Sequence, residues 1–282
     1  MVQLVALLLL QPSVAETRRI SATELPFERV HGVARSRSRW LVGGLRGLYL
    51  GAPGGDWREV SNQAVKTIVS TGNTAWVLYG NGAVDKVELD GDRLYYDVLK
   101  DAAKRPWAAS IAADRASLLF GGDGGWIEKS GSAFVEKYPV ELLAKQVTAA
   151  ARVGKELWLG TQDGLFHIVG GKPARLGFGA GMPDVWVTAL MPSGNSILAG
   201  LATGGLVRVE RDKVELIPTP STRVRLLARF GGRLVLGALD GAWILEGKSW
   251  TPLCDVEPTF IGELGNELVI GTPNGLRLFK SS

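Results

Sequence analysis

The chain has 282 residues, 46% hydrophobic and 21% charged, which suits one large all-β domain or two ordinary domains and excludes an intrinsically disordered protein. Its 37 glycines and 13 prolines favour many tight turns over long helices. The net charge of +4 is spread along the chain, which argues against nucleic-acid binding, and one cysteine with two distant histidines argues against a disulfide framework or a metal site.

The chain opens with an apolar run, Leu4 to Leu10, which is too short to span a bilayer because a spanning helix needs about 20 residues. Small residues follow at the positions where a signal peptidase cleaves, ending at Ala15. These features predict a signal peptide over residues 1–15, a linker over 16–25 and an exported mature chain. The competing interpretation is a frayed cytosolic N-terminus.

A short pattern then recurs seven times, at intervals of roughly 34 to 42 residues, which is the period of propeller and solenoid repeats. Each copy has one polar or small residue, three apolar residues and a glycine. The copies are "RWLVGG" from Arg39, "AWVLYG" from Ala75, "SLLFGG" from Ser117, "ELWLGT" from Glu156, "SILAGL" from Ser196, "RLVLGA" from Arg233 and "ELVIGT" from Glu267. The second copy places Tyr79 where the others have glycine.

A second glycine follows each copy, at Gly47, Gly82, Gly125, Gly164, Gly205, Gly241 and Gly275. We predict that the first glycine ends one strand and that the second supplies the positive φ of a tight hairpin. Two more short apolar segments complete each repeat, and four strands in about 38 residues make one propeller blade. A helical solenoid is a poor fit because it needs apolar residues at helical spacing and few glycines.

The ends of the chain predict how the ring closes. The last copy stops after its third strand, at "GLRLFKSS". The segment "PFERV", Pro26 to Val30, resembles the fourth strand "DWREV" from Asp56. Because an open ring leaves unpaired edges, we predict that Pro26–Val30 completes the final blade. The predicted fold is therefore one all-β, seven-bladed β-propeller over residues 26–282.

The sequences "LWLGTQDGL" and "GMPDVWV", within residues 157–187, resemble the repeat of two-component-regulator propellers, whose consensus reads roughly LWxGTxxGL and then GLPxxxV. "IGTPNGL" at Ile270–Leu276 is similar, and the resemblance covers the chain from about Val30 to Phe279. Propellers of that family usually form periplasmic ligand-sensing regions ahead of a membrane span and a kinase or cyclase module. The resemblance implies a propeller with a binding role rather than a signalling output.

Candidate site residues come from aligning the first strands of the repeats. In this topology the loops that enter the first strands share a face with the hairpins between second and third strands, and long loops on a rigid scaffold often carry function. One column of the alignment holds His31, Lys66, Thr148, Thr188 and Arg225. It predicts a cationic mouth for a small anionic molecule or for an acidic patch on an envelope protein. The simpler alternative is that Lys66 and Arg225 only hydrate the entrance.

Two tryptophans differ from the others because each follows a long loop at the start of a first strand. Trp107 and Trp186 are predicted to contact the ligand, with packing as the alternative, whereas the remaining tryptophans are interpreted as blade-packing residues. Asp163 and Asp240 occupy equivalent hairpin positions, which favours turn chemistry over an acid/base pair.

No GxSxG, HExxH or CxxC motif occurs in the sequence. We therefore expect a non-catalytic, sensor-like binding module of the bacterial cell envelope, periplasmic or secreted, without cofactor, metal or membrane span. Two alternatives remain open. One is a lyase or hydrolase acting on a carbohydrate or an anionic substrate in the same funnel, and the other is a scaffold for assembly of an envelope complex.

Overall fold

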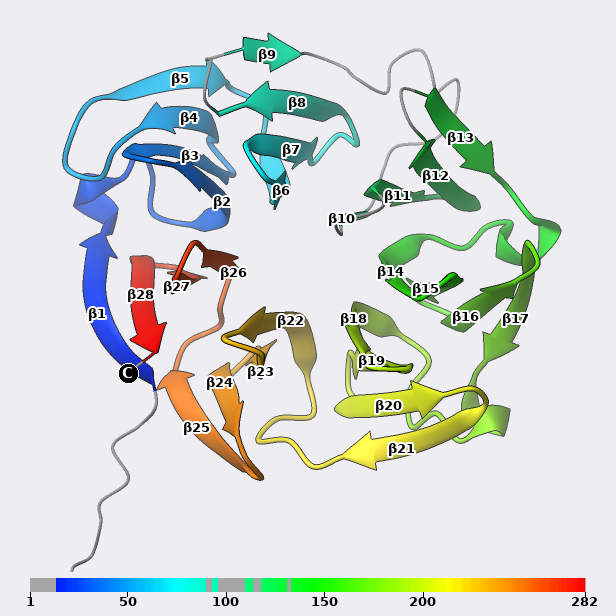
Figure 1. Cartoon of the computed structure of the whole chain (residues 1–282). Helices are drawn as coiled ribbons and strands as arrows, with labels where there is room; N and C mark the ends of the chain where they lie inside the picture. The colour runs from blue at the N-terminus through cyan, green and yellow to red at the C-terminus, as the bar shows by residue number, and fades with distance from the viewer. Residues whose placement is uncertain (1–13, 90–92, 96–109, 114–117, 131–132, 282) are drawn as a thin grey trace, which may run out of the picture.

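The computed structural model describes residues 14–89, 93–95, 110–113, 118–130 and 133–281. These residues form seven four-stranded antiparallel sheets, arranged as blades around a central axis (Figure 1). Within the described part, the helices are three short 3-10 turns: η1 (Ala22–Glu24), η2 (Val140–Leu142) and η3 (Phe178–Ala180). The predicted seven-bladed β-propeller is confirmed.

The strands of each blade follow one another from the axis outward. Blade 1 contains β2 (Val30–Ser36), β3 (Arg39–Gly44), β4 (Gly47–Gly51) and β5 (Trp57–Ser61); blade 2 contains β6 (Val65–Thr71), β7 (Thr74–Tyr79), β8 (Val84–Glu88) and β9 (Arg93–Tyr95). Blade 3 contains β10 (Ser110–Ala113), β11 (Leu118–Gly122), β12 (Gly125–Ser130) and β13 (Ala133–Lys137); blade 4 contains β14 (Val147–Val153), β15 (Glu156–Thr161), β16 (Gly164–Val169) and β17 (Lys172–Leu176).

Blade 5 contains β18 (Val187–Ser193), β19 (Ser196–Leu201), β20 (Leu206–Glu210) and β21 (Lys213–Ile217); blade 6 contains β22 (Val224–Phe230), β23 (Arg233–Ala238), β24 (Gly241–Glu246) and β25 (Ser249–Cys254). Blade 7 contains β26 (Phe260–Leu264), β27 (Glu267–Thr272), β28 (Gly275–Ser281) and, from the other end of the chain, β1 (Val14–Ser21). The first strands of neighbouring blades contact one another around the axis.

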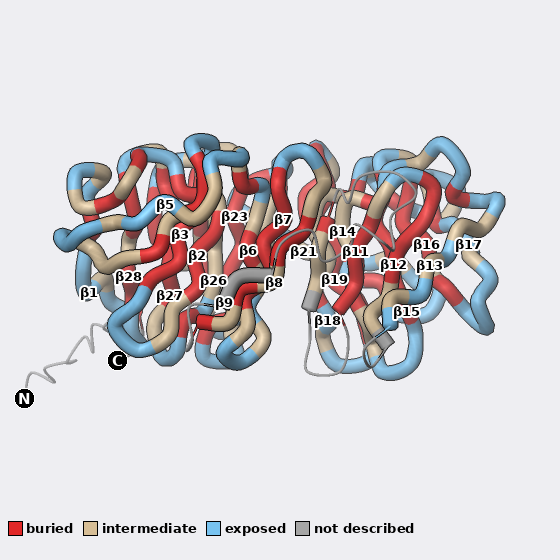
Figure 2. The backbone as a smooth tube through the Cα atoms, turned by 90° about the horizontal axis from the view of Figure 1, so that it is seen from above, coloured by how far each residue is buried: buried red, intermediate tan, exposed pale blue. Residues whose placement is uncertain are grey.

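The hydrophobic core lies between neighbouring blades rather than at the axis. Between blades 4 and 5, for example, Trp158 and Leu165 pack with Val187 and Ile197. Figure 2 shows the buried stretches within the strands and the exposed residues at the turns on both rims. Because apolar burial is the main favourable term in folding, the blades stabilise one another by contact.

The first glycine of the repeat has a different role from the one predicted. Gly160 lies inside β15 and does not end it. A Cβ atom at Gly160 would lie 2.5 Å from Cγ1 of Val187 in the next blade, so the missing side chain lets two blades approach closely. The same contact recurs at the pairs Gly43 and Val65, Gly121 and Val147, and Gly200 and Val224.

The second glycine behaves as predicted in most blades. Gly164 has a φ of +127°, a conformation that residues with side chains rarely adopt. In blade 3 the positive φ falls on Gly124 rather than on Gly125.

Blade 2 was misaligned by one residue in the sequence. Thr67 pairs with Leu78 as Ala149 pairs with Gly160, so Leu78 rather than Tyr79 occupies the glycine place. Tyr79 is buried, and its hydroxyl donates a 2.8 Å hydrogen bond to the buried carboxylate of Asp85.

The ring closes through the N-terminal part of the chain, but not through the predicted segment. β1 pairs antiparallel with β28, from Val14 opposite Ser281 to Ser21 opposite Gly275. Pro26–Val30 does not complete blade 7, because Val30 begins β2, the innermost strand of blade 1. The predicted linker over residues 16–25 is also wrong, since residues 16–21 are strand and 22–24 form η1. Residues 1–13 lie outside the described residues, so the signal peptide stays a prediction.

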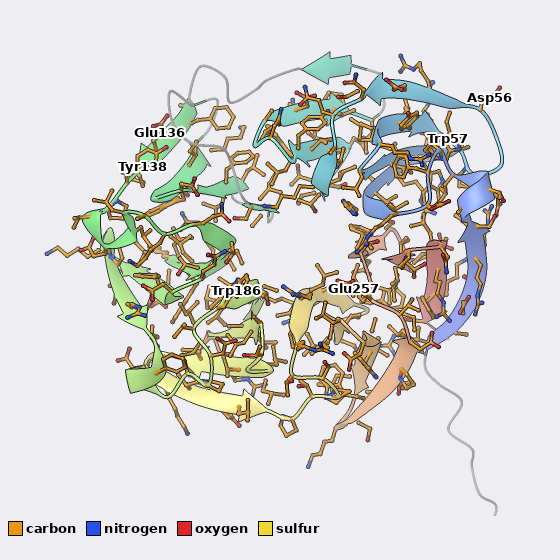
Figure 3. The ribbon with its side chains drawn as sticks, turned by 180° about the vertical axis from the view of Figure 1, so that it is seen from behind. Asp56, Trp57, Glu136, Tyr138, Trp186 and Glu257 are labelled. Carbon is orange, nitrogen blue, oxygen red and sulfur yellow. The ribbon has the colours of Figure 1, made fainter. Side chains whose placement is uncertain are left out.

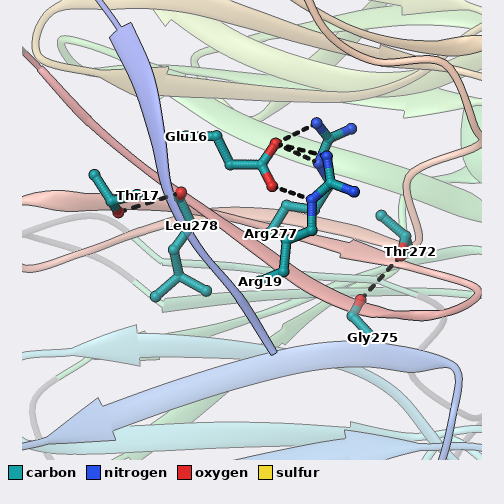
Figure 4. Close-up of polar contacts among 7 residues, drawn as sticks. All are labelled: Glu16, Thr17, Arg19, Thr272, Gly275, Arg277 and Leu278. Atoms are coloured by element: carbon teal, nitrogen blue, oxygen red, sulfur yellow. Dashed lines mark hydrogen bonds and ion pairs between the residues drawn. The ribbon is translucent and has the colours of Figure 1, made fainter. Parts of the chain in front are cut away.

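Polar contacts fix β1 on blade 7 (Figure 4). The Glu16 carboxylate accepts hydrogen bonds from Arg19 on the same strand and from Arg277 on β28. Burial raises the pKa of Glu16, but the hydrogen bonds from the two arginines outweigh it and the pKa is lowered. The Thr17 hydroxyl donates to the Leu278 carbonyl at 3.3 Å. Closure therefore combines a strand ladder with a paired carboxylate.

Candidate functional site

The loops that enter the first strands and the hairpins between second and third strands lie at one end of the ring. In blade 5, Val187 at the start of the first strand pairs with Leu201 at the end of the second. In blade 1, Val30 pairs in the same way with Gly44. We call this end of the propeller the entry face.

The predicted column shares one structural position on the entry face. In five first strands the pairing register shifts at the second residue, which is a β-bulge. The bulged residues are His31, Lys66, Thr148, Thr188 and Arg225. A bulge re-aims a side chain out of the regular alternation, and bulges are common beside functional sites.

Most side chains at this level tie one blade to the next. Thr148 Oγ1 donates to the Val187 carbonyl at 2.6 Å, and Thr188 Oγ1 donates to the Val224 carbonyl at 2.7 Å. Comparable bonds run from His31 Nδ1 to Val65 O, from Ser110 Oγ to Val147 O and from Thr259 Oγ1 to Val30 O. In the described part of the chain, five blade junctions are therefore linked by a side chain that donates to the carbonyl of the residue that begins the next blade's first strand.

Arg225 departs from this pattern. It is half-buried, and the described part of the chain provides no hydrogen bond or ion pair to its guanidinium group. A guanidinium is always charged and presents a planar fork of N–H donors that matches an oxyanion. Blade 6 therefore presents an unsatisfied cation where blade 5 has a threonine bonded to its neighbour.

Lys66 is the second cation of the column. Its side chain is exposed, yet the surrounding blades displace water from the ammonium group, and this desolvation lowers the pKa of Lys66. The carboxylate of Asp123 in the blade 3 hairpin acts in the opposite direction and raises it. The charged form of Lys66 is therefore less favoured in the folded protein than in the unfolded chain.

Replacing Lys66 by methionine should stabilise the folded protein at neutral pH. Because the folded-state pKa is depressed below its ordinary value of 10.5, the unfolded chain binds more protons than the folded chain between the two pKa values. The stability of the parent should rise with pH in that window, and the advantage of Lys66→Met should vanish near its upper end. Urea unfolding at several pH values from 7 to 10.5 measures how the free energy of unfolding changes with pH in the parent and in Lys66→Met. Lys213→Met, at an exposed site on β21, is the control, and equal slopes for parent and Lys66→Met would contradict the expectation.

Trp186 combines a fixed backbone with an exposed ring. The backbone N–H of Trp186 donates to Asp184 Oδ1 at 3.1 Å, and its backbone carbonyl accepts from the N–H of Ala202 at 3.0 Å. The other oxygen of Asp184 accepts two hydrogen bonds from Thr203. Burial raises the pKa of Asp184, but these hydrogen bonds outweigh it and lower the pKa. The Trp186 side chain nevertheless remains 43% exposed, and Figure 3 shows it beside the central axis.

Other predicted residues have structural roles or lie outside the described residues. Trp107 belongs to the latter group. Asp163 binds Arg175 through a 2.6 Å hydrogen bond and Lys145 at 3.4 Å, which agrees with a turn residue held by ion pairs. Among the residues that the structure describes, no cluster of His, Cys, Asp and Glu could hold a metal ion, and no helix is long and apolar enough to cross a membrane.

The opposite rim carries a set of arginines that the sequence analysis missed. Arg35, Arg152 and Arg229 each stand at the sixth residue of a first strand. Each contacts the preceding blade: Arg35 binds Glu267 at 2.7 Å, Arg152 binds Glu128, and Arg229 donates to the Pro192 carbonyl at 2.7 Å. Aligning the first strands over their full length would have found these arginines, because they recur five residues after the initial valine.

Two further surface features lie outside the column. On the entry face, Val140, Leu143 and Phe178 are exposed on the loops that lead into blades 4 and 5. On the opposite rim, a hollow of about 330 Å³ lies over blade 1, lined by residues that include Ser38, Asp56 and Arg58. The apolar loop residues form a second candidate contact surface on the face that holds Arg225 and Trp186.

No family model and no curated protein matches this sequence. Solved structures do resemble its fold. The extracellular domain of a hybrid two-component system from B. thetaiotaomicron has a TM-score of 0.76 at 13% identity, over 95% of this chain and 41% of that one. PorZ, a surface component of the type-IX secretion system of Porphyromonas gingivalis, has a TM-score of 0.68 at 15% identity, over 96% of this chain and 38% of that one.

The WD40 propeller domain of Doa1 is similar to nearly the same degree, with a TM-score of 0.72 at 13% identity, over 95% of this chain and 98% of that one. This chain therefore spans about two fifths of the two bacterial proteins and almost all of the Doa1 domain. At these identities the comparisons establish the propeller fold. They support the two-component propeller resemblance at the level of structure alone.

Proposed function

We propose that the protein is a non-catalytic binding module of the bacterial cell envelope, which takes a small anionic molecule at the entry face beside the axis. One observation carries this proposal: Arg225 holds a half-buried guanidinium without a partner among the described residues, where blades 4 and 5 bond to the next blade through threonine. Residues that forgo a stabilising contact without a packing reason are expected at functional sites.

Location in the envelope is supported by two independent lines. The apolar N-terminal run with small residues before Glu16 has the form of a secretory leader. Two of the similar structures are the extracellular domain of a hybrid two-component system and a bacterial surface component. An exported propeller with a cationic mouth would bind anionic solutes outside the cytoplasm.

Arg225→Thr tests the proposal. We expect small organic anions such as acetate and benzoate to raise the melting temperature of the parent, since a ligand at about 100 times its Kd stabilises the folded state by roughly 2.7 kcal/mol. Arg225→Thr should lose that shift. It should also melt higher than the parent without ligand, because a threonine here can bond the next blade as Thr188 does, which contributes about 1 kcal/mol.

The matched control is Arg223→Thr, which removes an exposed arginine two residues away and outside the bulge. It should keep the anion-dependent shift. An equal shift in the parent and in Arg225→Thr would place the anion elsewhere and overturn the proposal.

A second candidate function is protein docking on the same face. It is favoured by the exposed apolar side chains of Val140, Leu143 and Phe178, which a partner would remove from water. The same experiment separates the two candidates, because a docking module shows no shift with small anions. An enzyme in this funnel has no specific observation in its favour among the described residues.

A further inference from the structure

We infer that this site selects a carboxylate carried on a ring: the carboxylate binds Arg225 and one apolar face of the ring lies on Trp186. The inference rests on the proposed function and names its ligand class. It depends on the placement of an indole and a guanidinium on neighbouring blades at the same end of the ring.

The two residues are joined by a short, bonded path. Trp186 precedes Val187 and Thr188 at the start of blade 5. The Thr188 hydroxyl lies 2.7 Å from Val224 O and 3.0 Å from Gly200 O, so its one hydrogen is shared between the two carbonyls. Arg225 follows Val224 directly. The spacing between the two backbone positions is therefore set by a bonded blade junction.

The backbone that carries the indole is fixed before any ligand arrives. Its N–H is bonded to Asp184 and its carbonyl to Ala202, while 43% of the residue stays exposed. Preorganised groups lose little conformational freedom on binding. A flat apolar surface laid on this indole would remove both surfaces from water and gain the preferred stacking geometry of a π-system.

The guanidinium of Arg225 favours a planar anion, because a carboxylate matches its fork of N–H donors with two parallel hydrogen bonds. The acids on the loops that enter the neighbouring blades already have partners. Asp184, before blade 5, accepts hydrogen bonds from Trp186 and Thr203, and Glu257, before blade 7, lies 3.5 Å from Arg29. Figure 3 shows Trp186 and Glu257 on the two sides of this part of the axis.

Two sources supply such a ligand, an aromatic acid or a sugar acid, since both present a flat face with C–H or π character. Isothermal titration calorimetry on the full chain separates them with four probes. Benzoate and glucuronate carry a ring and a carboxylate, acetate carries the carboxylate alone, and glucose carries the ring alone. We expect benzoate or glucuronate to bind at least about tenfold more tightly than acetate, the equivalent of one aromatic contact, and glucose not to bind.

Three variants locate the effect. Trp186→Ala should reduce the ring carboxylate to the affinity of acetate without changing acetate itself, whereas Trp186→Phe, which keeps a flat ring, should retain most of the difference. Arg225→Lys should weaken both acids about tenfold, because an ammonium group lacks the planar fork. Phe178→Ala, an exposed apolar residue on the same loop, should change nothing.

The outcomes distinguish this inference from the proposed function. Equal affinity for acetate and both ring acids, or an unchanged ring preference in Trp186→Ala, overturns the ring selectivity and leaves anion binding at Arg225 intact. Failure of every carboxylate to bind the parent overturns both.

Discussion

Replacing Gly160 by alanine is expected to destabilise the protein by about 3 kcal/mol, at the upper end of the usual cost of overpacking a core. The added methyl group would lie 2.5 Å from Cγ1 of Val187, which is fully buried in the interface between blades 4 and 5. Neither group has room to move, because native cores are packed as densely as organic crystals. Urea unfolding followed by circular dichroism measures the loss of stability.

The control is Gly179→Ala, where an added Cβ meets nothing within 4 Å and no positive φ is required. It should leave stability nearly unchanged. The double variant Gly160→Ala with Val187→Ala completes a double-mutant cycle. If the two side chains collide, Val187→Ala relieves part of the destabilisation caused by Gly160→Ala. The two changes in the free energy of unfolding then do not add. Strict additivity would show that Gly160 is required for some other reason.

Replacing Ile20 by alanine is the second change with a large expected effect, also about 3 kcal/mol, the middle of the range for truncating a buried isoleucine. Ile20 is the buried anchor of β1, packed with Leu276 and Leu278 of blade 7. Its loss leaves a cavity where the two ends of the chain meet. The midpoint of urea unfolding should fall at unchanged slope, since the same surface is exposed on unfolding.

Arg18→Ala is the matched control on the same strand, because that side chain is 51% exposed. It should shift stability by no more than about 0.5 kcal/mol, as surface substitutions usually do. An Ile20→Ala variant as stable as this control would mean that the packing of β1 on blade 7 does not contribute to the stability of the propeller.

The number of blades could be predicted because the glycine-containing pattern recurs in the sequence, and in four blades its glycine makes the same contact with the next blade. A glycine facing the valine of the next blade leaves a repeated mark at Gly43, Gly121, Gly160 and Gly200. The closing strand β1 has no recurring pattern in the sequence that would identify it. The residues of β1 from Glu16 to Arg19 show no regular apolar alternation, and Pro26–Val30 was assigned instead because it resembles the fourth strand from Asp56. Leu78 in the glycine place of blade 2 explains the slip of one residue there.

The alignment of first strands was enough to collect His31, Lys66 and Arg225 at one structural position. It was not enough to distinguish them. Whether a bulged side chain donates to the next blade depends on where that blade's carbonyl lies, which is a matter of three-dimensional spacing. The exposure of Trp186 and its bonded backbone are likewise invisible in a sequence, which shows only that a tryptophan follows a long loop.

The pairing of β1 with β28 joins residues more than 250 positions apart, as the Thr17 contact with Leu278 shows. Because β1 precedes β28 by the length of six blades, blade 7 can form only after those blades have been synthesised. Folding rates fall as contacts become more distant in sequence, so ring closure is expected to be the slow step of folding.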